Sequence, residues 1–63
     1  MLTQREQEIA ALVAQGKTDQ EIADALGSSP RTVSGHVARI LDKLRLANRV
    51  QLAVHWVSEA RHA

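Results

Sequence analysis

The sequence predicts an all-α fold of four short helices, and two observations support this prediction. Capping motifs recur along the chain, each followed by apolar residues at helical spacing and then by glycine or a short polar segment. No segment alternates apolar and polar residues over the length of a strand. Because 63 residues suffice for one small domain only, we predict a single four-helix bundle over residues 1–63.

The first two helices begin with the same motif. Thr3-Gln4-Arg5-Glu6 and Thr18-Asp19-Gln20-Glu21 are capping boxes, in which a hydroxyl and a carboxylate three residues on each accept a hydrogen bond from an unpaired backbone N–H. Gly16 and Gly27 offer the C-terminal stops. Apolar residues lie at helical spacing between each capping box and the glycine that follows, and they predict the inward faces of the two helices. They are Ile9, Leu12, Val13, Ile22, Ala23 and Leu26.

The third helix is expected from about Pro30 to about Arg45, with Ser29 as its cap and Pro30 at the first position, where the missing N–H costs nothing. Only two residues separate the second helix from this cap, so the two helices must cross steeply, with the small Ala23 at their contact. This is helix-turn-helix geometry over about residues 18–45. The predicted inward stripe is Val33, Val37, Ile40, Leu41 and Leu44.

The opposite face of the third helix is polar and carries a glycine. Its members by helical periodicity are Arg31, Ser34, Gly35, Ala38, Asp42 and Arg45, with Arg39 and Lys43 on a flank. Glycine inside a helix costs about 1 kcal/mol relative to alanine. Either this face approaches another surface closely at Gly35, or the glycine is simply tolerated on an exposed surface.

The fourth helix, expected from Asn48 to about Arg61, has two apolar stripes. Leu52, Ala53, Trp56 and Ala60 form one, suited to covering the other three helices, and Val50, Val54 and Val57 form a second beside it. Together they exceed the arc that one small core covers. The valines therefore predict a second interface, either between two copies of the chain or with another domain of a longer protein.

Composition excludes several classes of protein and site. The chain has no cysteine, which excludes disulfides and thiolate zinc sites, and it has no apolar run long enough to span a bilayer. The net charge is +1, but residues 1–29 carry −3 and residues 30–63 carry +4. This asymmetry favours an anionic partner for the second half, although small domains also show it by chance.

These residues resemble the LuxR-type helix-turn-helix domain found in many bacterial transcription regulators, including response regulators of the NarL kind. The matching runs are Leu2-Thr3-x-Arg5-Glu6-x-Glu8-Ile9, Gly16-x-Thr18-x-x-Glu21-Ile22-Ala23-x-x-Leu26, Ser29-x-x-Thr32-Val33-x-x-His36, Ile40-x-x-Lys43-Leu44 and Asn48-Arg49. The resemblance implies that the third helix enters the major groove of DNA and that the fourth pairs two domains. It also implies a cytoplasmic protein that acts at the bacterial nucleoid, with a receiver or sensor domain upstream in a longer chain.

The sequence departs from the family pattern at the surface expected to face DNA. The family usually has lysine or arginine at Ser34, often a long polar side chain at Ala38, and commonly asparagine and lysine at Asp19 and Gln20. We therefore expect weak sequence readout by each domain. The predicted base contacts are Arg31, Ser34, Gly35 and Ala38. The predicted phosphate contacts are Thr18, Thr32, Arg39, Lys43 and Arg49.

Several residues also fit functions other than DNA binding. Ser34, His36 and Asp42 include the residue types of a hydrolytic triad, but one surface helix offers neither pocket nor oxyanion hole. His55 and Glu59 supply only two metal ligands, so neither an enzyme nor a cofactor or metal is expected. His36 is expected to be a packed structural residue, and Arg5 and Glu8 to form ion pairs between helices. A protein-interaction module on the same scaffold and region 4 of a sigma factor remain the alternatives, the helix after Leu46 disfavouring the latter.

Overall fold

The computed structural model describes residues 1–62, with side chains described through Arg61, and Ala63 of the predicted domain lies outside the described residues. It contains four helices and no strand within that range: α1 (Gln4–Ala14), α2 (Asp19–Leu26), α3 (Pro30–Leu44) and α4 (Arg49–His62). The all-α prediction is therefore confirmed, and the helix boundaries differ from the expected ones by about a residue. No described helix has the length and apolar character needed to cross a membrane.

The predicted capping motifs set the helix starts. Glu6 N donates to Thr3 Oγ1 at 3.1 Å and Thr3 N donates to Glu6 Oε1 at 2.8 Å, which completes the first box. The second box has the same two bonds between Thr18 and Glu21. Asn48 caps α4 by accepting a hydrogen bond from Gln51 N at 3.0 Å. These bonds satisfy N–H groups that a helix start otherwise leaves unpaired.

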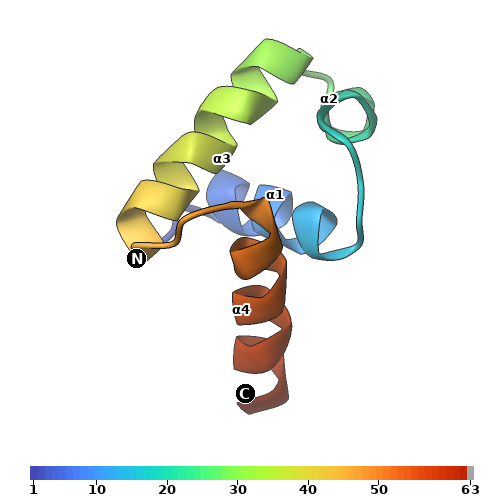
Figure 1. Ribbon diagram of the computed structural model, residues 1–63. Coiled ribbons are helices and arrows are strands. Elements are labelled where there is room, and N and C mark those ends of the chain that lie inside the picture. Colours follow the sequence, from blue (N-terminus) through green and yellow to red (C-terminus); the bar gives the residue numbers. More distant parts are fainter. Residues whose placement is uncertain (63) are drawn as a thin grey trace.

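The turn between α2 and α3 has the expected form. Gly27 adopts a left-handed conformation, with φ of 66°, and Ser28 N donates to Ala23 O at 2.9 Å across the helix end. Figure 1 shows α2 nearly end-on while α3 runs across the view, so the two axes cross steeply. Ala23 is fully buried at this crossing, as predicted.

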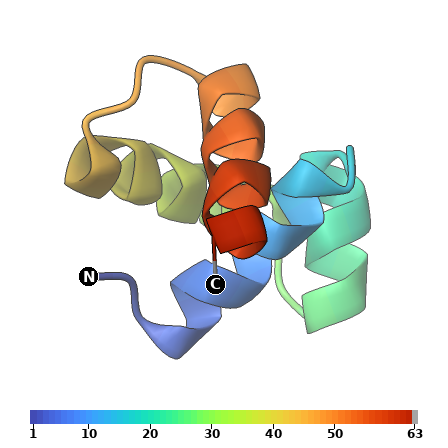
Figure 2. The same ribbon diagram turned by 90° about the horizontal axis from the view of Figure 1, so that it is seen from below.

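One core joins all four helices. Its buried members are Ile9, Ala10, Val13, Ile22, Ala23, Val33, Val37, Ile40 and Leu52, with Leu2, Leu12, Leu26, Leu41, Leu44, Leu46 and Trp56 packed around them. The predicted inward stripes therefore supply most of the core. Ala60 is an exception, because it is exposed: α4 extends beyond the other helices, so that its last turns have no core to cover (Figure 1). In the view from below, this part of α4 lies in front of the other helices (Figure 2).

The end of α3 also differs from the prediction. Arg45 was expected on the outward face of the helix, but it is the residue after the last turn, in a left-handed conformation with φ of 56°. Leu46 N donates to Leu41 O at 2.9 Å, which closes the helix end as a glycine would at this position. Arg45 is thus the one non-glycine residue with positive φ within residues 1–62.

Candidate nucleic-acid interface

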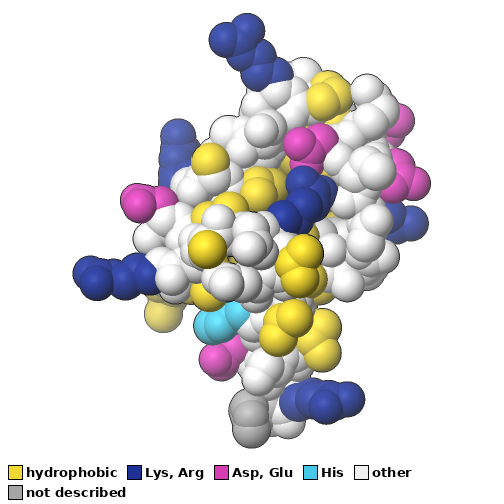
Figure 3. All heavy atoms as spheres, viewed as in Figure 1, with side chains coloured by type: hydrophobic (Ala, Val, Ile, Leu, Met, Phe, Trp, Pro, Cys, Tyr) yellow, Lys and Arg dark blue, Asp and Glu magenta, His cyan; other side chains and the backbone are white. Residues whose placement is uncertain are grey.

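The outward face of α3 is open to solvent along its length. Arg31, Ser34, Gly35 and Ala38, the predicted base contacts, are all exposed. Apart from its chain neighbours and the backbone of its own helix turn, a methyl group at Gly35 would meet no atom of the described residues within 4 Å. Lys and Arg side chains project from the outer side of α3 in Figure 3. The core-forming residues of α3 are on the other side of the helix, so this face is free to meet a partner.

Thr32 and Arg39 lie on the same helix and are exposed as well. The Thr32 hydroxyl accepts a hydrogen bond from Ser29 Oγ at 2.9 Å, while Thr32 N donates to the same Ser29 oxygen at 3.2 Å. The cap therefore fixes the Thr32 side chain at the start of α3, close to Arg31. Arg39 is exposed on the flank of the face and forms no ion pair within the described residues.

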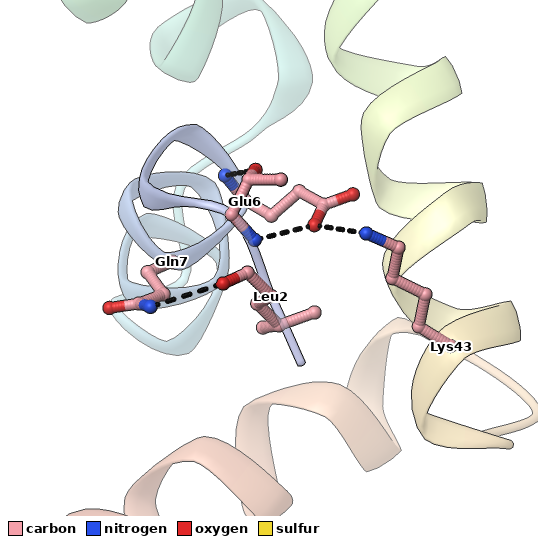
Figure 4. A network of polar contacts seen from close by, with 5 residues as sticks. Leu2, Glu6, Gln7 and Lys43 are labelled. Carbon is pink, nitrogen blue, oxygen red and sulfur yellow. Dashed lines mark hydrogen bonds and ion pairs between the residues drawn. The ribbon is translucent and has the colours of Figure 1, made fainter.

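Two of the predicted phosphate contacts make ion pairs inside the domain. Lys43 Nζ donates to Glu6 Oε1 at 2.8 Å, from α3 to α1 (Figure 4). Arg49 Nη1 donates to Asp19 Oδ1 at 2.5 Å, from α4 to α2. Sequence reasoning missed both pairs, because partners 37 and 30 residues apart leave no signal in helical periodicity.

Thr18, the fifth predicted phosphate contact, is the exposed cap of α2. Its hydroxyl accepts from Glu21 N at 3.1 Å, and its own N–H donates to Glu21 Oε1 at 2.8 Å. The backbone N–H of Thr18, and after it the Thr18 hydroxyl, favour the ionised carboxylate of Glu21 and so lower its pKa. The N–H groups of Asp19 and Gln20 have no carbonyl four residues earlier in the helix, so they point out of its start.

His36 is half-buried, as expected of a packed residue, and its Nδ1 is buried without a hydrogen-bond partner in the described residues. It lines a small hollow of about 250 Å³ together with Arg5 and Ser28. Arg5 pairs with Glu8 on its own helix at 3.8 Å, so the expectation of a pair between helices was wrong. No group of three potential metal ligands exists among the described residues.

The valine stripe of α4 is exposed, as predicted. Val50, Val54 and Val57 are 72%, 65% and 45% exposed, and Figure 3 shows apolar side chains together on the upper part of α4. Shallow hollows flank the stripe where α4 meets the end of α1, lined by Ala14, Ala53 and Val57 on one side and by Val13 and Val50 on the other. An apolar face of this kind fits a partner surface.

Comparison with known proteins identifies the family. A model described as bacterial regulatory proteins of the luxR family matches residues 1–56. The chain is 46% identical over 54 residues to the transcriptional regulatory protein LiaR of Bacillus subtilis and 50% identical over 52 residues to the transcriptional regulatory protein UhpA of Salmonella typhimurium. It is 46% identical over 55 residues to the response regulator protein VraR of Staphylococcus aureus.

These matches cover 86%, 82% and 87% of the chain but 26% of each relative. The chain therefore spans about a quarter of the length of the curated relatives it matches. The match with the family model includes all of α1, α2 and α3 and the first half of α4. The chain belongs to the luxR family of bacterial regulatory proteins.

Proposed function

We propose that the chain binds double-stranded DNA as the output domain of a bacterial transcriptional regulator, with α3 in the major groove. The observation that carries this proposal is the outward face of α3, which is exposed and has an unobstructed backbone at Gly35. A major groove of about 12 Å width admits one helix. The names of the relatives, which are transcriptional regulatory and response regulator proteins, support the same function.

The contacts divide into two kinds in this proposal. Arg31 reads a guanine edge, for which a bidentate pair is worth about 1–3 kcal/mol, and Ala38 touches a thymine methyl group. Ser34 and Gly35 allow close approach and discriminate little. Thr18, Thr32 and Arg39 contact phosphates, and Lys43 joins them through ammonium hydrogens that Glu6 leaves unused.

The valine stripe pairs two copies of the domain in this proposal, which aligns two α3 helices with two half-sites. Burying three valines on each copy yields only several kcal/mol, before the entropic cost of association is subtracted. Self-association is therefore weak without DNA. We further propose that an upstream receiver or sensor domain controls this pairing, since the relatives are about four times as long as the matched segment.

The test is duplex binding over a range of salt concentrations, with a library of duplexes to report base preference. The logarithm of the association constant should fall with the logarithm of salt, by about 0.9 for each phosphate contacted. Arg31→Ala should relax the preference at one base pair in each half-site. An Arg31→Ala variant with unchanged preference would contradict the assigned reader.

A protein-interaction module is the second candidate. The internal pairs of Lys43 and Arg49 favour it, because Arg31 and Arg39 are then the cations of α3 that have no ion-pair partner among the described residues. Such a module would show little duplex affinity and no steep salt dependence in the same experiment.

A further inference from the structure

Arg49 joins the starts of two helices that are distant in the sequence. Its Nη1 donates to Asp19 Oδ1 at 2.5 Å, and its Nη2 donates to the carbonyl oxygen of Lys17 at 2.7 Å. Asp19 is the first residue of α2 and Arg49 the first residue of α4. The planar guanidinium can serve two acceptors at once, which a lysine ammonium does with less geometric definition. The first turn of α2 is therefore fixed to the first turn of α4.

The pair also changes the charge at the start of α2. The Asp19 side chain is 33% exposed and adjoins Thr18, at the end of α2 where its N–H groups point outward. A carboxylate here suits the helix dipole, but it repels a phosphate brought to the same N–H groups. Arg49 places its positive charge directly on this carboxylate, so the pair presents no net charge to an approaching anion.

A direct contact between Arg49 and a phosphate would undo this arrangement. To reach the phosphate, the guanidinium would have to turn away from Asp19 and from the Lys17 carbonyl. The Asp19 carboxylate would then face the same phosphate unpaired. The gain from one new ion pair would be offset by the loss of another and by the exposed negative charge.

We propose that Arg49 is a positioning residue for DNA binding, which neutralises Asp19 and holds the start of α2 against α4, rather than a phosphate contact. This inference rests on the proposed function, because it concerns how α2 meets the duplex. It also explains how the domain accommodates an acidic residue at the start of α2, beside the outward-pointing N–H groups.

A double-mutant cycle tests the proposal. Duplex affinity is measured by fluorescence anisotropy over a range of salt concentrations for the wild type, Arg49→Gln, Asp19→Asn and the double variant, with a labelled duplex selected by the wild type. Arg49→Gln should weaken binding about three- to tenfold, because Asp19 becomes unpaired near a phosphate. Adding Asp19→Asn should restore affinity to within about twofold of the wild type, with the wild-type salt dependence.

The opposite result has a distinct signature. If Arg49 contacts a phosphate, the double variant stays as weak as Arg49→Gln and its salt slope falls by about 0.9 in magnitude. Either result would overturn the proposal. Arg61→Gln and Glu59→Gln are matched controls, because they make the same charge changes at exposed positions on the far part of α4. Each should change affinity by less than about twofold.

A measurement without DNA guards against misfolding as the cause. Arg49→Gln should shift the backbone amide resonances of residues 17–21 in the free protein while leaving those of α3 in place. Arg49→Lys keeps the charge and should bind within about threefold of the wild type. A wild type without duplex affinity would overturn the proposed function and this inference together, whereas binding without restoration in the double variant would overturn this inference alone.

Discussion

Lys43 on α3 and Glu6 on α1 form an ion pair of 2.8 Å at one end of the bundle. The same Glu6 oxygen accepts a hydrogen bond from Thr3 N at 2.8 Å, so it serves the cap of α1 and α3 together (Figure 4). The Glu6 side chain is only 3% exposed. The Lys43 hydrogen bond and the Thr3 N–H lower the pKa of Glu6 from its ordinary value of 4.5 to about 2.

This pKa predicts how stability depends on pH. Because the pKa of Glu6 is lower in the folded than in the unfolded chain, its contribution is complete above 4.5 and is lost as the pH falls towards 2. The urea midpoint should therefore fall over that window. Glutamine can also serve as the third residue of a capping box, so Glu6→Gln should keep the cap while making the urea midpoint depend less on pH. Some decline should remain, because the lowered pKa of Glu21 acts in the same direction. A Glu6→Gln curve parallel to the wild type would refute this assignment.

The anchoring of α4 to the core should depend on one side chain. Leu52 is fully buried, whereas Val54 on the same helix is 65% exposed. Leu52→Ala should lower the free energy of unfolding by about 2–5 kcal/mol, through lost burial and the cavity left behind. Val54→Ala, the matched control, should change it by less than about 0.5 kcal/mol. Urea denaturation measures the free energy of unfolding of each variant. Equal losses in the two variants would mean that Leu52 is not the side chain that anchors α4 to the core.

The left-handed Arg45 offers a stabilising substitution. A non-glycine residue in this conformation costs roughly 1–2 kcal/mol, so Arg45→Gly should raise the free energy of unfolding by about 1 kcal/mol. Gly27 has a similar conformation, with φ of 66°. Gly27→Ala should therefore lower the free energy of unfolding by about 1 kcal/mol. Thermal unfolding compares the pair, and destabilisation by Arg45→Gly would show that the arginine side chain is needed there.

A substitution at Gly35 should affect the stability of the domain and its affinity for DNA in opposite directions. It lies inside α3 with open space around it, so Gly35→Ala should stabilise the free domain by about 1 kcal/mol. If α3 approaches DNA closely at this point, the added methyl group should also weaken duplex binding. Denaturation and anisotropy on the same variant give both values. Unchanged affinity would instead identify Gly35 as an exposed glycine without a role in binding.

The valine stripe should control pairing without controlling the fold. Val54→Asp places a charge on an exposed surface, so the monomer should stay folded, with a loss below about 1 kcal/mol. Cooperative binding to a duplex with two half-sites should disappear, because a charge in an apolar interface is costly to desolvate. Affinity for a single half-site should persist. If Val54→Asp still bound the two half-sites cooperatively, a surface other than the valine stripe of α4 would have to pair the two copies.

The fold could be predicted closely because its signals are local. Capping boxes, Pro30 and the left-handed Gly27 act within a few residues, so they can be recognised directly in the chain. The exposed Val50, Val54 and Val57 followed from periodicity in the same way. The left-handed conformation of Arg45 could not be predicted in this way, because arginine has no preference for positive φ. Its conformation comes from Leu41 and Leu46, whose packing closes the end of α3.

The candidate site was predictable in part. Exposure of Arg31, Ser34, Gly35 and Ala38 follows from the position of the core stripe on α3. The partners of Lys43 and Arg49 depend on how α1, α2 and α4 are placed around that helix. Charge alone made both side chains candidates for phosphates, and only the three-dimensional arrangement shows the carboxylates that hold them.

The division of α3 into an interior side and an outward side has an evolutionary consequence. Val33, Val37 and Ile40 maintain the interior, while Arg31, Ser34 and Ala38 contribute nothing to it. New side chains at the outward positions cost little stability, so mutation can sample many of them without loss of the native state. Duplicated genes for such a domain can thus diverge towards new binding partners while every descendant keeps the same scaffold.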